Sequence, residues 1–173
     1  MEWQSVPGRN CDECTLCCKL LAIQAINKPD GQWCPWCKIG HGCTRYDDRP
    51  DSCRKFACNF LKDAALSEAW RPNKCHIVLR TEDEGRRLMV TVDPSRPQAW
   101  KNKLHYEQLK TWSRLAWPRG GQVFVVIGKR VIAILPDREL DLGLIEEGDQ
   151  IEWGSEISAQ GRRFNVWRSS KPT

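Results

Sequence analysis

The sequence predicts an α+β protein in two parts. A loop- and helix-rich domain with a cluster of cysteines is expected at residues 1–75, followed by a small antiparallel sheet with one covering helix at residues 76–173. All ten cysteines fall between residues 11 and 75, so the composition changes abruptly near residues 70–76. Beyond that point, short β-forming runs surround one long helical run. A chain of 173 residues, 40% of them hydrophobic, is also long enough to bury a core.

The cysteine-rich part begins with mixed signals. Residues 19–26, "KLLAIQAI", are an apolar run that fits either a helix or a strand. Residues 27–33, "NKPDGQW", indicate a turn because Pro29 and Gly31 interrupt regular structure. Residues 34–43, "CPWCKIGHGC", contain a proline and two glycines and predict a loop.

A helix is predicted from about Pro50 through "DSCRKFACNFLKDAAL". Proline suits the first helical position, and Asp47, Asp48 and Asp51 suit the positive end of the helix dipole. At helical spacing, one face would hold Cys53, Phe56, Ala57, Phe60 and Ala64. We expect this face to pack under the cysteine cluster.

The second part predicts strands in pairs. "CHIVLR" and "RRLMVTVD" lie on either side of "TEDEG", which indicates a hairpin with a solvated tip. "QVFVVIG" and "KRVIAILP" meet at Gly128 and indicate another hairpin. Residues 149–154 and 162–169 are weaker strand candidates.

Between the two hairpins, residues 94–118 predict a helix that ends at Pro118. Its apolar stripe would comprise Leu104, Leu109, Trp112 and Leu115. Trp100, Trp112 and Trp117 could bind a flat ligand or a partner, but such aromatic residues more often fill a core against a sheet. We expect core residues here, and we expect any protein partner to contact this second domain.

Charge and hydropathy limit the classes of function. Residues 1–75 carry 11 basic and 9 acidic residues and the remainder carries 16 and 13, so no basic block predicts nucleic-acid binding. Residues 1–10 lack the apolar segment of a signal peptide, and no apolar run is long enough to predict a membrane span. We expect a cytoplasmic protein. Because thiols stay reduced in that compartment, ten cysteines favour metal binding over disulfides.

The first cysteine array has the spacing C-x2-C-x2-C-C and comprises Cys11, Cys14, Cys17 and Cys18. A gap of two residues lets a tight turn direct both sulfurs at one ion, as in zinc knuckles and iron–sulfur loops. Adjacent cysteines rarely bind the same ion, and a disulfide between them would be strained. The pattern therefore predicts that Cys17 and Cys18 point in different directions, with one of them serving a second site.

The second array comprises Cys34, Cys37, Cys43, Cys53 and Cys58. "CPWC" is similar to a thioredoxin-type dithiol but lacks the strand-to-helix context of that motif. On a continuous helix Cys53 and Cys58 would differ by about 140°, so they could share one ion only if the helix ended between them. His41 is a candidate ligand, although its glycine neighbours are also explained by a flexible loop. Cys75 is expected to be a spare buried thiol.

In order along the chain, "CDECTLCC", "WCPWC" and "GCTRYDDRPDSCRKFAC" resemble the YkgJ-type CxxCxxCC family. Its members are described as zinc- or iron-chelating proteins, and the resemblance covers roughly residues 11–62, about a third of the chain. The resemblance implies metal binding by Cys11, Cys14, Cys17, Cys18, Cys34, Cys37, Cys43, Cys53 and Cys58. Flagellin lysine methylases carry a related cluster, but no further motif here supports methyl transfer.

Nine cysteines exceed the capacity of one tetrahedral site, so two zinc ions or iron–sulfur clusters are both compatible with the count. We favour an iron–sulfur cluster, because the close C-x2-C-x2-C run can supply three ligands and a remote cysteine the fourth. Trp33 and Trp36 could shield such a cluster from water, or they could be plain core residues, which we prefer.

Three functions remain open. The first is a redox or binding module, the second is an iron–sulfur enzyme that modifies a protein or small molecule, and the third is a zinc-stabilised structural or metal-handling protein. The charges of "YDDRPDSCR" could clamp a substrate, although we prefer a structural role in capping the helix and holding the loop. The sequence carries no nucleotide-loop, zincin or hydrolase motif, so no catalytic residue is assigned.

Overall fold

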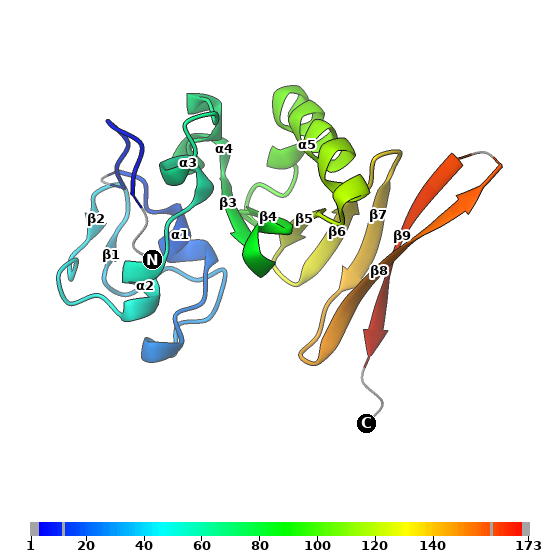
Figure 1. Ribbon diagram of the computed structural model, residues 1–173. Helices are drawn as coiled ribbons and strands as arrows, with labels where there is room; N and C mark the ends of the chain where they lie inside the picture. The colour runs from blue at the N-terminus through cyan, green and yellow to red at the C-terminus, as the bar shows by residue number, and fades with distance from the viewer. Residues whose placement is uncertain (1–3, 12, 160, 171–173) are drawn as a thin grey trace. The chain divides into compact units, whose positions relative to one another are not determined.

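The computed structural model describes residues 4–11, 13–159 and 161–170 and has an α+β fold (Figure 1). The chain divides into two compact units: Met1–Arg80 with Thr91–Trp100, and Thr81–Val90 with Lys101–Thr173. The boundary predicted at residues 75 and 76 stays a prediction. Residues 1–3 of the stretch predicted to lack a signal peptide lie outside the described residues. Within the described part, no helix has the length and apolar character needed to cross a membrane.

The helices are short with one exception. The α-helices are α1 (Leu16–Leu20), α2 (Asp51–Lys55), α3 (Asn59–Lys62), α4 (Pro72–Cys75) and α5 (Lys103–Ala116). The 3₁₀ helices are η1 (Gln24–Ile26), η2 (Glu68–Trp70), η3 (Asp83–Gly85), η4 (Ala99–Lys101) and η5 (Trp117–Arg119). The apolar run at residues 19–26, which fitted a helix or a strand, is divided between α1 and η1.

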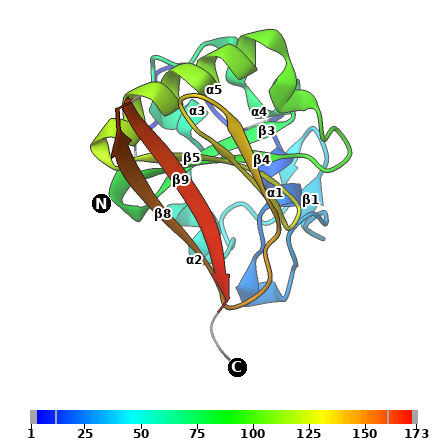
Figure 2. The same ribbon diagram turned by 90° about the vertical axis from the view of Figure 1, so that its right-hand side faces the viewer.

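The strands of the described residues form one larger sheet and two ribbons. The larger sheet has the order β3-β4-β5-β6-β7, and β1 pairs with β2 and β8 with β9. The bounds are β1 (Cys37–Lys38), β2 (Gly42–Cys43), β3 (Ile77–Glu82), β4 (Arg87–Val92), β5 (Gln122–Ile127), β6 (Arg130–Ile134), β7 (Glu139–Leu144), β8 (Asp149–Ser158) and β9 (Gly161–Ser170). The predicted hairpins around "TEDEG" and Gly128 are confirmed. The weaker strand candidates are also confirmed, as a long hairpin of β8 and β9 (Figure 2).

The helix predicted from Pro50 is interrupted, which corrects the sequence interpretation. The helix α2 ends at Lys55, Phe56 is extended, and Cys58 caps the start of α3 with extended dihedral angles. Ala57 and Phe60 are both buried although the chain turns between them, so tertiary burial outweighs the local preference for one helix. The single face predicted for Cys53, Phe56, Ala57, Phe60 and Ala64 therefore does not exist.

Long polar side chains fasten the loops of the first unit. The Arg9 guanidinium donates to the carbonyl oxygens of Phe60 at 2.5 Å and Asp63 at 2.7 Å, and also to that of Leu66. The buried Lys28 ammonium donates to the carbonyl of Lys19 at 2.9 Å and to that of Leu21. These contacts satisfy backbone carbonyls that the short helices leave unpaired.

In the second unit, α5 packs against β5 and β6 (Figure 1). Leu109 is fully buried, but Leu104 and Leu115 are exposed, so the predicted apolar stripe is wrong for these two leucines. The buried face instead includes Lys110 and Ser113, which donate to the carbonyls of Leu135 at 2.8 Å and Ile134 at 2.5 Å. Polar residues can occupy the buried face because the end of β6 offers acceptors for them.

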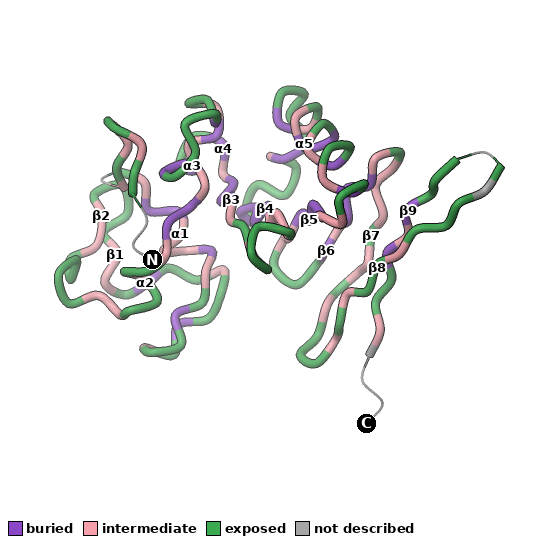
Figure 3. The backbone as a smooth tube through the Cα atoms, in the orientation of Figure 1, coloured by how far each residue is buried: buried purple, intermediate pink, exposed green. Residues whose placement is uncertain are grey.

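Trp100 and Trp117 are buried core residues, as expected, whereas Trp33, also expected in a core, is exposed. Trp117 packs at 5.7 Å from Phe164 and donates from Nε1 to the carbonyl of Ile134 at 2.8 Å. The two units differ in how continuously they are buried: buried segments line α5 and β5, whereas the loops around β1 and β2 are half-buried or exposed (Figure 3).

Candidate metal centre

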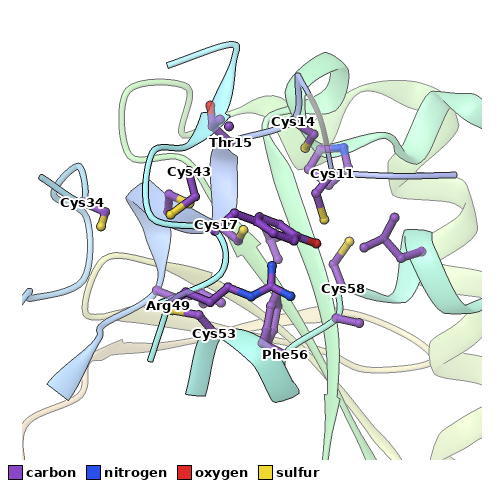
Figure 4. Close-up of a pocket in the computed structure, with 18 of the residues that line it drawn as sticks. Cys11, Cys14, Thr15, Cys17, Cys34, Cys43, Arg49, Cys53, Phe56 and Cys58 are labelled. Carbon is purple, nitrogen blue, oxygen red and sulfur yellow. The ribbon is translucent and has the colours of Figure 1, made fainter. Parts of the chain in front are cut away.

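Eight of the nine predicted ligand cysteines line one cavity of about 890 Å³ in the first unit (Figure 4). These are Cys11, Cys14, Cys17, Cys18, Cys34, Cys43, Cys53 and Cys58. Cys37 does not line the cavity, but its thiol donates a hydrogen bond to Cys18. The fold therefore brings residues separated by more than forty positions in the sequence into one place.

Separate short elements supply the thiols. Cys11 and Cys14 lie in the turn before α1, where the Cys14 amide donates to the Cys11 carbonyl at 2.9 Å. Cys17 and Cys18 lie on α1, Cys53 on α2, and Cys58 at the start of α3. Each element is too short to be stable in isolation, so the packing of the unit fixes where its thiols lie.

The segment after α1 is tied to it through the backbone. The Cys34 amide donates to the Cys18 carbonyl at 3.0 Å, and the Cys37 amide donates to the Cys34 carbonyl at 3.0 Å. Cys37 and Cys43 are directly opposite each other in the β1–β2 ladder. The Gly40 amide donates to Thr15 Oγ1 at 3.2 Å, which fastens the tip of this ribbon to the start of α1. The predicted loop at residues 34–43 thus contains a small hairpin that the sequence analysis missed.

Burial holds most of these thiols in the protonated form. It raises the pKa of Cys11 to about 11 and that of Cys37 to about 12, and it also raises the pKa of Cys14, Cys53 and Cys58. Removal of thiolates from water disfavours their charge. A bound cation would reverse this preference, because a metal replaces the thiol proton with a positive charge.

The adjacent thiols Cys17 and Cys18 were predicted to point in different directions, but they are hydrogen-bonded to each other. The hydrogen bond from the Cys17 thiol lowers the pKa of Cys18 to about 6, and the thiol of Cys37 also donates to Cys18. The same hydrogen bond, together with burial, raises the pKa of Cys17. Among the thiols whose pKa is shifted, that of Cys18 thus ionises most readily.

Positive side chains lie beside the thiols. Arg49 lines the cavity, its guanidinium lies 3.7 Å from the centre of the Tyr46 ring, and its buried Nε has no hydrogen-bond partner among the described residues. Its charge acts on both Cys11 and Cys18, and that of Lys28 acts on Cys18. Arg49 was expected to hold the loop in preference to clamping a substrate. Its place before Pro50, between Cys43 and Cys53, was the available signal for a position in the site.

The thiols line one cavity, but they are not arranged as a preformed metal site. All ten cysteines have free thiols. Among the described residues, no three His, Cys, Asp or Glu side chains are close enough together to hold an ion. Metal binding would therefore require side-chain rotation within the cavity. The donor set fits zinc or an iron–sulfur cluster, both of which take four cysteine thiolates.

The remaining candidates lie at the edge of this arrangement. His41 lines the cavity, but it is exposed and its Nδ1 lies 3.0 Å from the carbonyl oxygen of Ile39. Cys75 is buried, as expected, and its thiol lies 3.5 Å from the carbonyl of Ile77, outside the residues that line the cavity. Arg54 holds the loop before α2 by donating to the carbonyls of Arg49 at 2.9 Å and Asp47 at 2.7 Å.

Comparisons with protein-family models, with curated proteins and with solved structures gave no match for this chain. The resemblance to the YkgJ-type family stays a prediction that rests on the quoted motifs.

Proposed function

We propose that the first unit is a metal-binding module whose cysteines hold iron–sulfur clusters, and that the protein acts as a redox or binding module. The observation that carries this proposal is the convergence of eight motif cysteines on one cavity. Free cysteines usually behave as isolated small hydrophobic residues in a core. Eight cysteines around one cavity are better explained by a shared ligand. Soft thiolates are the ligands of zinc and of iron–sulfur clusters.

Thiols and positive side chains around the cavity favour the binding of a metal cation by thiolates. Each thiol that becomes a ligand releases its proton, so binding should strengthen as the pH rises. The pKa of Cys18 is lowered by the hydrogen bond from Cys17, so this thiol can provide the first contact. Arg49 and Lys28 partly balance the negative charge that accumulates as further thiols ionise.

The dimensions of the cavity favour clusters over a single zinc ion. A structural zinc site is closed, with four ligands in contact with one ion. The cavity of about 890 Å³ is instead in the range of cofactor and small-molecule sites. Trp36 and Phe56 line it and would limit the access of water. When bound, an iron–sulfur cluster supplies one-electron chemistry, with a potential that depends on nearby charge and solvent exposure.

An iron–sulfur enzyme is the second candidate, and one observation favours it. Arg49 lines a cavity large enough to admit a small molecule beside a metal, and its buried Nε has no hydrogen-bond partner among the described residues. Arginine is well suited to bind carboxylate or phosphate groups. This candidate predicts turnover of a substrate that Cys14→Ser abolishes and Arg49→Gln weakens.

Purification without oxygen, followed by absorption spectroscopy and metal analysis, tests the proposal. We expect a brown protein that absorbs at about 400 nm, as iron–sulfur clusters do, and that contains iron and acid-labile sulfide. A colourless protein with stoichiometric zinc would exclude the clusters but keep metal binding. A protein that retains neither metal and whose cysteines are paired would exclude the proposal altogether.

A further inference from the structure

We propose that the motif cysteines form two separate metal centres, divided at the peptide bond between Cys17 and Cys18. This inference rests on the proposed metal binding and adds which thiols share a centre. The first centre would use Cys11, Cys14, Cys17 and Cys58. The second would draw its four ligands from Cys18, Cys34, Cys37, Cys43 and Cys53.

The first group is assembled by the segment before α1 and the start of α3. The Val6 amide donates to the Leu61 carbonyl at 2.7 Å, and Arg9 binds the carbonyls of Phe60 and Asp63, so residues 6–9 lie against α3. This places Cys11 beside Cys58, whose thiols face each other in Figure 4 and interact electrostatically. Cys14 also interacts with both Cys11 and Cys58.

The second group is assembled by the β1–β2 ribbon and α2. Backbone hydrogen bonds join Cys34 to Cys18 and Cys37 to Cys34, and strand pairing places Cys37 opposite Cys43. The thiol of Cys53 interacts with those of Cys18, Cys34 and Cys43. Figure 4 shows Cys34, Cys43 and Cys53 on the opposite side of the cavity from Cys11 and Cys58.

The helix α1 determines where the division falls. Successive residues on a helix are about 100° apart, so Cys17 and Cys18, whose thiols are hydrogen-bonded to each other in this structure, can rotate toward different centres. The strongest partner of the Cys17 thiol is Cys18, and Cys17 also interacts electrostatically with Cys11 and Cys14 of the first group. Cys18 accepts a hydrogen bond from Cys37 of the second group, and its backbone carbonyl accepts from the Cys34 amide. It also interacts electrostatically with Cys11 and Cys14, so it lies where the two groups meet.

The break between α2 and α3 separates Cys53 from Cys58 in the same way. Phe56 is extended and lines the cavity, and it directs the chain from one group to the other. The guanidinium of Arg49 acts on a thiol of each group, Cys11 and Cys18, and lies between Cys53 and Cys58 in Figure 4. One cation is therefore shared by two anionic centres. Each group contains at least four thiols, which is the ligand number of one zinc ion or one [4Fe–4S] cluster.

Metal content of single and double variants tests this division. Wild-type protein should bind about eight iron and eight sulfide per chain, or about two zinc ions, against about half as much for one centre. Cys58→Ser and Cys17→Ser should each remove about half of the metal, and the double variant should lose no more than either single variant. Cys58→Ser with Cys18→Ser should lose nearly all of it. Cys75→Ser is the matched control and should retain the full content.

The outcomes separate this inference from the proposed function. Metal bound at the stoichiometry of one centre overturns the division but leaves metal binding in place. Loss of all metal from Cys58→Ser alone, in protein whose circular dichroism is unchanged, also overturns it. If a variant fails to fold, the wild-type stoichiometry decides. Absence of any bound metal from the wild-type protein overturns both.

Discussion

The two units of the chain bury different kinds of residue. In the second unit, α5 and the strands beside it enclose Trp117 and Phe124, and this unit contains no cysteine. In the first unit, the buried residues include Cys34, Cys58 and Cys75, and no α-helix among its described residues exceeds five residues. Both units thus bury apolar side chains, Trp70 and Trp100 among those of the first, but only the first also buries thiols.

This difference shows where a metal would contribute to folding. Short helices and loops lose conformational entropy on ordering, and they recover little of it through regular packing. Thiolate–metal bonds can supply the missing stabilisation, because binding free energy at such a site is folding free energy. We therefore expect the first unit to depend on metal and the second to be independent of it.

The largest expected effect is that of metal removal. Binding at a structural thiolate site contributes about 10–16 kcal/mol of apparent free energy, so stripping the metal should unfold or loosen the first unit. Hydrogen exchange measured by mass spectrometry should show lost protection around α1 and α2, with the protection of α5 and β5 retained. Equal loss of protection in both units would remove the distinction between them.

The converse experiment truncates the core of the second unit. Trp117 is 1% exposed and packs on Phe164, so Trp117→Ala should cost about 3–5 kcal/mol. Chemical denaturation should detect this loss, while the metal content stays unchanged. Trp167→Ala, at a tryptophan that is 46% exposed, is the control and should have a small effect. Loss of metal from the Trp117 variant would contradict the independence of the units.

A charge-dependent effect is expected in metal-free protein at high pH. The folded state raises the pKa of Cys11 from 9.0 to about 11 through burial, so this thiol stabilises the fold fully below pH 9. That contribution should be lost as the pH rises from about 9 to about 11, because the unfolded chain ionises first. Denaturation midpoints across this range should fall for the wild-type protein and fall less for Cys11→Ser. Identical slopes for the two proteins would contradict the buried position of this thiol.

A smaller effect is expected when the segment before α1, which carries Cys11 and Cys14, loses its contacts with α3. Arg9 donates to the carbonyls of Phe60, Asp63 and Leu66, and Arg9→Ala should cost about 1–3 kcal/mol by leaving them unsatisfied. The loss should appear as faster hydrogen exchange at α3 and weaker metal retention. Arg9→Lys, which keeps the charge but not the planar donor set, should be intermediate. Unchanged exchange at α3 would contradict this role.

The smallest expected effect concerns Arg49. If the centre is an iron–sulfur cluster, its positive charge favours the reduced and more negative form. Arg49→Gln should therefore lower the midpoint potential, on the order of 60 mV for a tenfold change in a one-electron equilibrium. Arg45→Gln is a matched control, because Arg45 stacks on Trp36 at 5.0 Å and is exposed. A raised potential, or an equal shift in both variants, would contradict the shared position of Arg49.

The regular parts of the second unit could be predicted from local patterns. The hairpins β3–β4 and β5–β6 follow from apolar strands around polar or glycine-containing turns. The helix α5 follows from its helical spacing, although it begins at Lys103 and not at residue 94 as predicted. Strand β7 was missed, because "ELDLGL" includes two acidic residues and a glycine that weaken its strand signal. Leu104 and Leu115 were misplaced, since only the fold reveals that backbone carbonyls accept from the buried polar side chains of α5.

The candidate site could be predicted as a set but not as an arrangement. The resemblance carried by the motifs implied the nine cysteines, and eight of them share a cavity. The break at Phe56 depends on tertiary burial and therefore could not be read from residues 50–66. The cavity position of Arg49 and the neighbours of Cys17 and Cys18 depend on contacts between distant segments. Those contacts have no signature in residue spacing.

The most direct test of metal binding is native mass spectrometry of protein purified without oxygen. Under non-denaturing conditions the chain should carry the added mass of iron and sulfide or of zinc. After acid denaturation it should return to the mass of the chain with all ten cysteines reduced. A native mass equal to that of the bare chain, with cysteines oxidised in pairs, would contradict the account.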